Sequence, residues 1–125
     1  MKIAPSSEHA LHLQVVQWLK LARPKIGGVP VVWWTVDQTA LNSRHGRTLK
    51  NKGVRPGVPD LSFVLPPVGR AAYIELKSSA GKQTESQVSF ENDVRMAGAL
   101  YALCRSLGEV EGTLQAWGVL KEKAA

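Results

Sequence analysis

Three ionisable side chains at short spacing, Asp60, Glu75 and Lys77, are the residues of this 125-residue chain best suited to chemistry. Asp60 precedes an apolar segment, and Glu75 and Lys77 lie two residues apart in the next one. Side chains alternate between the two faces of a β-strand, so Glu75 and Lys77 share a face, opposite the apolar Ile74 and Leu76. The pattern predicts an acid and a base where a half-buried strand usually carries solvent-tolerant side chains.

The segment between the two predicted strands, Pro66 to Arg70, has the Pro and Gly residues of a hairpin turn. In the register that pairs Ser62 with Tyr73, Asp60 lies directly opposite Glu75, with Cβ atoms about 4.5–5.5 Å apart. Two carboxylates this close repel each other unless one is neutralised or a cation lies between them. Oxygen ligands at this spacing suit Mg²⁺ or Mn²⁺, so we expect a metal site.

The residues around these side chains resemble the PD-(D/E)XK nuclease superfamily, and within it the VRR-NUC (virus-type replication-repair nuclease) branch. The run GVRPGVPDL contains Asp60, the run YIELKSSAGKQTESQ contains Glu75 and Lys77, and Gln87 ends that second run. The similarity extends from Glu8 to Arg105, which is most of the chain. The resemblance implies a restriction-endonuclease-like core with the order αβββαβ and metal-dependent cleavage of DNA.

The resemblance also implies a role for each of these residues. Asp60, Glu75 and the main-chain carbonyl of Leu76 hold the cation, and Glu8 completes the ligand shell directly or through water. The cation polarises the scissile phosphate and lowers the pKa of a bound water, which Lys77 orients or deprotonates. The competing interpretation is a surface ion pair between Glu75 and Lys77, worth about 0–1 kcal/mol and without chemistry.

Glu8 and Gln87 each have a structural alternative that the sequence leaves open. Glu8 lies in the first turn of a helix that begins at Ser6 or Ser7, where an acid also complements the helix dipole. Thr84 and Gln87 have the spacing of a capping box, in which Gln87 accepts the first N–H of its own helix. Gln87 therefore caps the helix, contacts the substrate, or does both.

Basic residues lie on both sides of Asp60 in the sequence. Charge runs of this kind are usually solvated faces, but their proximity to an acidic metal site favours contacts with phosphates, each of which steepens the salt dependence of binding. Gly53 and Gly57 either supply positive φ angles or let a nucleic-acid backbone approach closely. The predicted nucleic-acid contacts are Arg44, Arg47, Lys50, Lys52, Arg55 and Lys82. The histidines His9, His12 and His45 lack metal-ligand spacing and are expected at the surface, where His45 could contact phosphate.

The hydrophobic pattern predicts an α/β fold, with a mixed central sheet flanked by helices and a right-handed crossover to a parallel last strand. The segment Val29–Val36 is apolar on both faces, so we expect it to be central or covered on both sides, with Trp33 and Trp34 in the core. The expected elements are a first helix ending before Pro24, strands at Val29–Val36, Leu61–Leu65 and Ala71–Lys77, a helix from Thr84 to Gly98, a strand at Ala99–Cys104, a last helix at Val110–Leu120, and a short helix within Asp37–Lys52.

The composition predicts one folded domain over residues 1–125, with tails at 1–5 and 121–125. The chain is 44% hydrophobic and 21% charged, and no apolar run approaches the roughly 20 residues of a membrane span. The N-terminus lacks a secretory signal and Cys104 is the single cysteine, which favours a reducing, cytoplasmic setting. The resemblance to VRR-NUC nucleases adds a bacterial or phage origin. The net charge of +6 favours a polyanionic partner.

These expectations combine into a metal-dependent DNA endonuclease that uses Mg²⁺ or Mn²⁺. The resemblance adds selectivity for branched, flapped or four-way (Holliday) junction DNA and a place in DNA repair. So small a chain has little surface beyond its site to read DNA, which favours a homodimer. Two alternatives remain: a nucleic-acid-binding module without catalysis on the same scaffold, and a phosphodiesterase acting on RNA or nucleotides.

Overall fold

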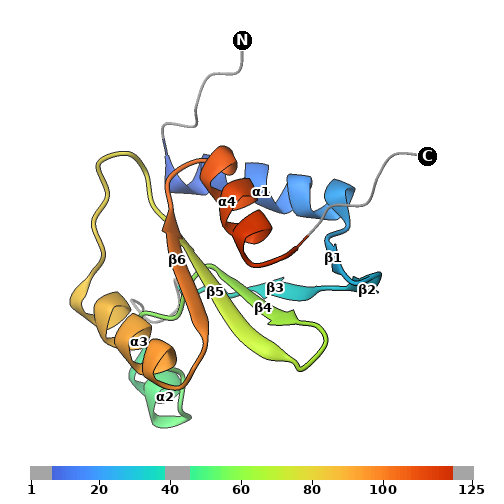
Figure 1. Ribbon diagram of the computed structural model, residues 1–125. Helices are drawn as coiled ribbons and strands as arrows, with labels where there is room; N and C mark the ends of the chain where they lie inside the picture. Colours follow the sequence, from blue (N-terminus) through green and yellow to red (C-terminus); the bar gives the residue numbers. More distant parts are fainter. Residues whose placement is uncertain (1–6, 39–45, 120–125) are drawn as a thin grey trace.

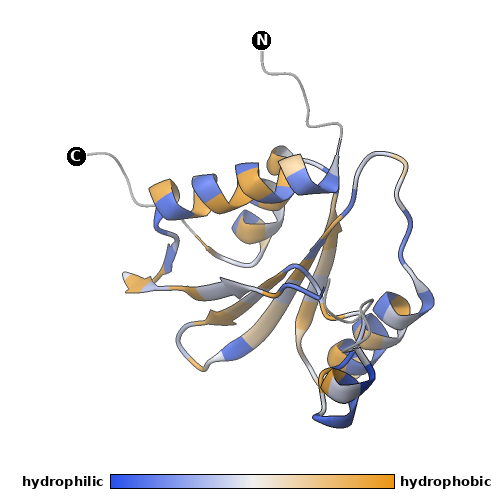
Figure 2. Cartoon of the chain, turned by 180° about the vertical axis from the view of Figure 1, so that it is seen from behind, coloured by the Kyte–Doolittle hydropathy of each residue, from blue (hydrophilic) through white to orange (hydrophobic). Residues whose placement is uncertain are grey.

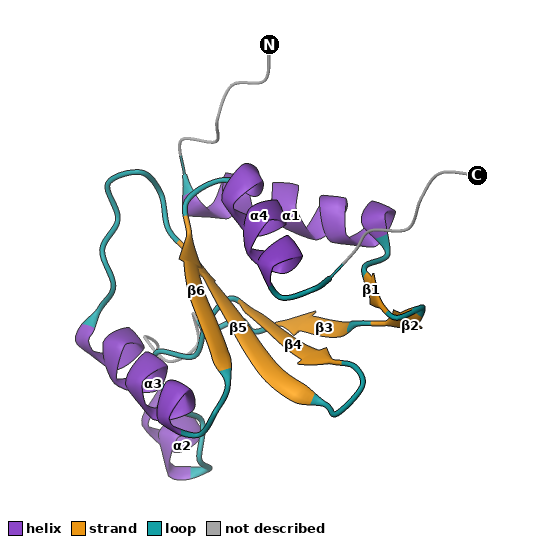
Figure 3. Ribbon diagram, in the orientation of Figure 1, coloured by secondary structure: helices purple, strands orange, loops and turns teal. Residues whose placement is uncertain are grey.

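A four-stranded mixed sheet with helices on both faces forms the body of the chain (Figures 1 and 3). The structure is a computed structural model that describes residues 7–38 and 46–119. The strand order is β3-β4-β5-β6, in which β3, β4 and β5 are antiparallel and β6 is parallel to β5. The elements are α1 (Glu8–Ala22), β1 (Lys25–Ile26), β2 (Val29–Pro30), β3 (Val32–Thr35), α2 (Gly46–Asn51), β4 (Leu61–Leu65), β5 (Arg70–Leu76), α3 (Glu85–Met96), β6 (Leu100–Cys104) and α4 (Leu107–Ala116).

The predicted α/β class and the αβββαβ order are confirmed. Three short elements add to that order: α2 precedes β4, and β1 and β2 form a two-stranded hairpin between α1 and β3. The helices α1 and α4 lie on one face of the sheet, and α3 and α2 lie on the other (Figure 1). The last helix begins earlier than predicted because Ser106, whose side chain accepts the N–H of Glu109, caps it.

The helix α1 is capped by Ser7, whose side-chain oxygen accepts the N–H of Ala10 at 3.1 Å. Leu11, Val15 and Leu19 follow at helical spacing and are almost fully buried against the sheet. Hydrophilic residues alternate with them along the helix (Figure 2). This periodicity fixes which side of α1 contacts the sheet, and therefore where the first turn of the helix, the turn that carries Glu8, must lie.

The hairpin of β4 and β5 has the predicted register. Ser62 pairs with Tyr73 and Val64 pairs with Ala71. Continued by two residues beyond the pair of Ser62 and Tyr73, the same register places Asp60 opposite Glu75, at the end of the hairpin away from its turn. The two faces differ as predicted: Ile74 and its neighbours on one face are buried under α1 and α4, whereas the face of Tyr73 meets α3.

The strand predicted to be central is instead at the edge of the sheet. The segment Val29–Val36 divides into β2 and β3, and β3 pairs only with β4 among the described strands. Val32 is 59% exposed and Trp34 is 46% exposed, so the expectation of a core position is wrong for Trp34. Trp33 faces α1 and packs against the core. The error has a physical cause: α3 contacts β6 and β5, and leaves the other face of β3 uncovered.

Candidate active site

A hollow of about 680 Å³ at the open end of β4 and β5 brings together several of the predicted site residues. We call it the carboxylate hollow. Asp60 and Glu75 line it from the sheet, Gln87 from the first turn of α3, and Glu8 and His12 from α1. The chain therefore carries its acids to one place from segments that are far apart in sequence.

Asp60 is held by contacts to both neighbouring strands. Its Oδ2 accepts the main-chain N–H of Leu76 at 2.8 Å, which ties the carboxylate to β5. Its main-chain carbonyl accepts the N–H of Val36 at 3.3 Å, at the end of β3. A carboxylate fixed in this way needs little reordering to bind a ligand.

Glu75 is a buried acid with one oxygen unsatisfied. The residue is only 3% exposed, and its Oε1 accepts a hydrogen bond from the Gln87 side-chain amide at 3.1 Å. Its Oε2 is buried without a hydrogen-bond partner among the described residues. Burial and then the nearby Asp60 raise the pKa of Glu75 from 4.5 to about 9, although Lys77 opposes the shift. A cation would satisfy this oxygen and favour the ionised form.

The side chains therefore fit a hard divalent cation, with two carboxylates and one orphaned oxygen at the same place. Within residues 7–38 and 46–119, no group of three or more His, Cys, Asp or Glu side chains is arranged to hold a metal. Two acidic side chains, those of Asp60 and Glu75, are thus the ligands best placed in this hollow. The assignments of the Leu76 carbonyl and of Glu8 as ligands stay predictions.

Lys77 is buried next to the acids, which excludes a surface ion pair. Its side chain follows Glu75 on the same face of the chain and, as a residue, it is 6% exposed. Its Nζ lies 3.9 Å from Oε1 of Glu8, whose side chain is about half exposed. The ammonium group of a buried lysine flanked by carboxylates interacts with those carboxylates instead of with solvent. That is the setting the predicted role of Lys77 requires.

Glu8 contacts the loop that follows β5 as well as Lys77. A Cβ added at Gly81 would lie 3.0 Å from Oε1 of Glu8 and 3.2 Å from the Ser78 hydroxyl, so the absence of a side chain makes room for the acid. The guanidinium of Arg105 donates to the carbonyls of Ser78 and Gly81, each at 2.7 Å, and fixes this loop. Sequence reasoning missed Arg105, because an arginine after a buried strand gives no signal of which carbonyls it will meet.

Gln87 has both a structural and a site contact. Its Oε1 accepts the Thr84 N–H at 2.9 Å and its N–H donates to the Thr84 hydroxyl, which confirms the capping box. The side-chain NH₂ group of Gln87 donates to Oε1 of Glu75. Direct contact with a substrate stays a prediction, but the residue already joins the start of α3 to the buried acid.

His12 is a residue of the hollow that the sequence interpretation missed. Its side chain is 28% exposed, and its Nδ1 lies 3.8 Å from Oδ1 of Asp60. The available signal was its position four residues after Glu8, which puts both on one side of α1. His9 also lines the carboxylate hollow, while His45 lies outside the described residues.

Gly57, three residues before Asp60, is in close contact with main-chain atoms of the first turn of α3. Its φ is +84°, and a Cβ there would lie 2.4 Å from the main-chain carbon and oxygen of Ser86 and 2.7 Å from the N of Gln87. The close approach is therefore made by the first turn of α3, rather than reserved for a nucleic-acid backbone. A Cβ added at Gly53, where φ is +93°, would have nothing within 4 Å, so only the backbone angle favours glycine there.

Gly57→Ala is expected to destabilise the fold by about 2–5 kcal/mol, since it combines positive-φ strain with overpacking against main-chain atoms. The matched control is Gly53→Ala, which has the strain alone and should cost about 1–2 kcal/mol. Urea unfolding of both variants measures the difference. Equal losses for the two variants would show that the contact with Ser86 and Gln87 is unimportant.

The metal-free protein is expected to lose stability as the pH rises from 4.5 toward 9. The unfolded chain ionises Glu75 near pH 4.5 and the folded protein only near pH 9, so the folded state binds more protons in this window and stability falls with pH. Thermal unfolding in EDTA at several pH values, compared with Glu75→Gln, isolates this contribution. An unchanged pH dependence in Glu75→Gln would contradict it.

The predicted nucleic-acid contacts lie outside the carboxylate hollow. Arg47, Lys50 and Lys52 are exposed on and just after α2, and Lys82 is exposed in the loop before α3. Arg55 pairs with Asp93 at 2.7 Å and lies over the ring of Phe90, so it fastens its loop to α3. Arg44 lies outside the described residues. Contact of these cations with DNA stays a prediction.

Comparison with known proteins identifies the family. The sequence model of the VRR-NUC domain matches residues 7–107. The chain belongs to the VRR-NUC domain family. No match was found among curated proteins.

Solved structures with the VRR-NUC name share the fold. One, titled VRR-NUC domain protein, is 20% identical, with a TM-score of 0.67 over 87% of this chain and 85% of that one. Another, titled VRR-NUC domain, is 16% identical, with a TM-score of 0.56 over 89% of this chain and 98% of that one. VRR-NUC domains are nucleases in general, which agrees with the acids gathered here. In the described part of this VRR-NUC domain, no helix is long and apolar enough to cross a membrane.

Proposed function

We propose that this VRR-NUC domain is a divalent-metal-dependent DNA endonuclease that prefers branched, flapped or four-way junction DNA. The observation that carries the proposal is the meeting of Asp60 and Glu75, with the unsatisfied Oε2 of Glu75, beside the buried Lys77. A bound Mg²⁺ or Mn²⁺ would polarise the scissile phosphate and lower the pKa of its water. Selectivity among DNA structures and a homodimeric state are further parts of the proposal, supported by family membership and by the small size of the domain.

The chain's own residues have distinct parts in this proposal. Asp60 and Glu75 supply negative oxygens in fixed positions, the first through the Leu76 N–H and the second through Gln87. Lys77 orients the attacking water or accepts its proton, and its charge offsets the negative charge that builds on the phosphorus centre. Exposed cations on and near α2 hold the DNA backbone outside the hollow.

The test is incubation of purified protein with a four-way junction, a flap and a plain duplex of the same sequence, each in Mn²⁺, in Mg²⁺ and in EDTA. We expect cleavage only with the metals, and faster cleavage of the junction or flap than of the duplex. Equal turnover of the three substrates would remove the selectivity. Salt-sensitive binding without products under any divalent cation would instead support the non-catalytic binding module.

A further inference from the structure

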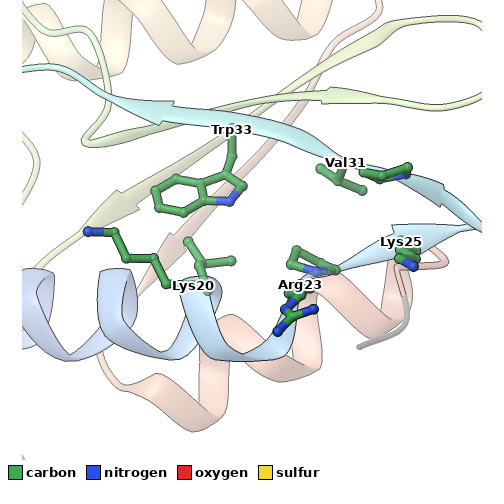
Figure 4. A pocket seen from close by; sticks show the side chains of 8 residues that line it. Lys20, Arg23, Lys25, Val31 and Trp33 are labelled. Carbon is green, nitrogen blue, oxygen red and sulfur yellow. The ribbon is translucent and has the colours of Figure 1, made fainter. Parts of the chain in front are cut away.

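A second hollow, of about 500 Å³, lies between the C-terminal half of α1 and the β2–β3 segment (Figure 4). We call it the α1–β3 cleft. Lys20, Arg23 and Lys25 line it together with Trp33, whose indole ring stands over the helix. None of the described residues that line it is acidic. Three cations around an aromatic surface suit a ligand that carries both negative charge and a flat, apolar part.

The same two elements line both hollows. Near the acids, α1 contributes Glu8 and His12 and β3 contributes Thr35; at the cleft they contribute Lys20 and Trp33. Lys20 follows His12 by eight residues, which is about 12 Å along a helix. A strand that passes through the carboxylate hollow and follows α1 would therefore reach the cleft within a few nucleotides.

We propose that the α1–β3 cleft binds the unpaired strand of a branched or flapped DNA substrate, a few nucleotides from the cleavage site. This rests on the proposed nuclease function. The cations neutralise successive phosphates, and Trp33 provides a surface against which an unstacked base packs. Single-stranded DNA fits this chemistry better than duplex, because the bases of a duplex stack on one another and do not present their faces to an indole ring.

The first measurement uses fluorescently labelled duplexes with a single-stranded arm of zero to eight nucleotides, bound in EDTA so that no cleavage occurs. At 3.4 Å or more per nucleotide, an arm of about four nucleotides spans the distance to the cleft. We expect affinity to increase by about fivefold or more up to that length and then to level off. An arm that gives no gain in the wild-type protein would overturn the inference.

Two double variants with the same loss of charge then locate the contact. Lys20→Gln with Lys25→Gln should remove most of the gain from the arm and reduce the salt slope for armed DNA by about 0.7 per lost contact. Lys50→Gln with Lys52→Gln, on and after α2, should weaken armed and unarmed duplexes by the same factor and keep the gain. A gain that survives in the first double variant would overturn the inference.

Trp33→Leu adds an aromatic test, with its melting temperature measured because Trp33 packs against the core. We expect a smaller gain from the arm with an unchanged salt slope, since a stacking contact releases no counterions. Failure of the proposed function would look different. Arm-dependent binding without cleavage in any metal would refute the nuclease and leave the cleft intact, whereas metal-dependent cleavage without arm dependence would refute the cleft alone.

Discussion

Lys77→Met is expected to lower kcat for DNA cleavage by about 10²–10⁴, the range that a positioned acid or base contributes. Methionine keeps the apolar stem in its buried position and removes only the ammonium group beside Glu75 and Glu8. Single-turnover cleavage at saturating protein, with Mn²⁺, measures the chemical step. Binding of DNA in EDTA should change little, because one charge among many contacts is lost.

The control for this variant is Lys82→Met, five residues further along and exposed. We predict that its charge contacts a phosphate, so we expect a higher KM and a kcat close to that of the wild-type protein. A kcat for Lys77→Met within tenfold of wild type would remove Lys77 from the reaction. Equal losses of kcat for the two lysines would point to overall charge instead.

Asp60→Asn is expected to abolish both cleavage and stabilisation by Mn²⁺. At a concentration 100 times its dissociation constant, a ligand stabilises the folded state by about 2.7 kcal/mol, which raises the melting temperature of the wild-type protein by several degrees. Asparagine has the same shape and its carbonyl can still accept the Leu76 N–H, so the substitution removes charge with little change of structure. Differential scanning fluorimetry with and without Mn²⁺ measures the shift.

Asp93→Asn is the matched control, because its carboxylate pairs with Arg55 on the surface, away from the carboxylate hollow. It removes the same charge and should keep the full Mn²⁺ shift. If Asp60→Asn also keeps that shift, the metal is bound elsewhere. Because the readout is stability, the result is independent of whether any DNA is cleaved.

The parts of the fold that depend on short stretches of sequence could be predicted. Strand alternation and a Pro- and Gly-rich turn determine the hairpin register, and that register brings Asp60 opposite Glu75. The capping box was predictable for the same reason, since Thr84 and Gln87 are only three residues apart. In both cases local geometry leaves few alternatives.

Features that depend on how distant elements pack could not be predicted. An apolar strand has the same sequence pattern whether or not a helix covers it. The edge position of β3 and the exposure of Trp34 could therefore not be predicted from the sequence. The approach of His12 to Asp60 depends on the rotation of α1 above the sheet. The burial of Lys77 likewise depends on the end of β5 being enclosed by α1 and the following loop.

The contact between Gly57 and the start of α3 is made by peptide groups on one side and a bare α-carbon on the other. A change in the size of one side chain can be compensated by a substitution of its neighbour, but main-chain atoms are the same in every residue and allow no such compensation. The spacing between the Asp60 loop and α3 therefore does not depend on the nearby side chains, and the one change that it does not tolerate is a side chain at Gly57. Gln87, which donates to Glu75, is thereby kept at a fixed distance from the Asp60 loop whatever side chains surround the two segments.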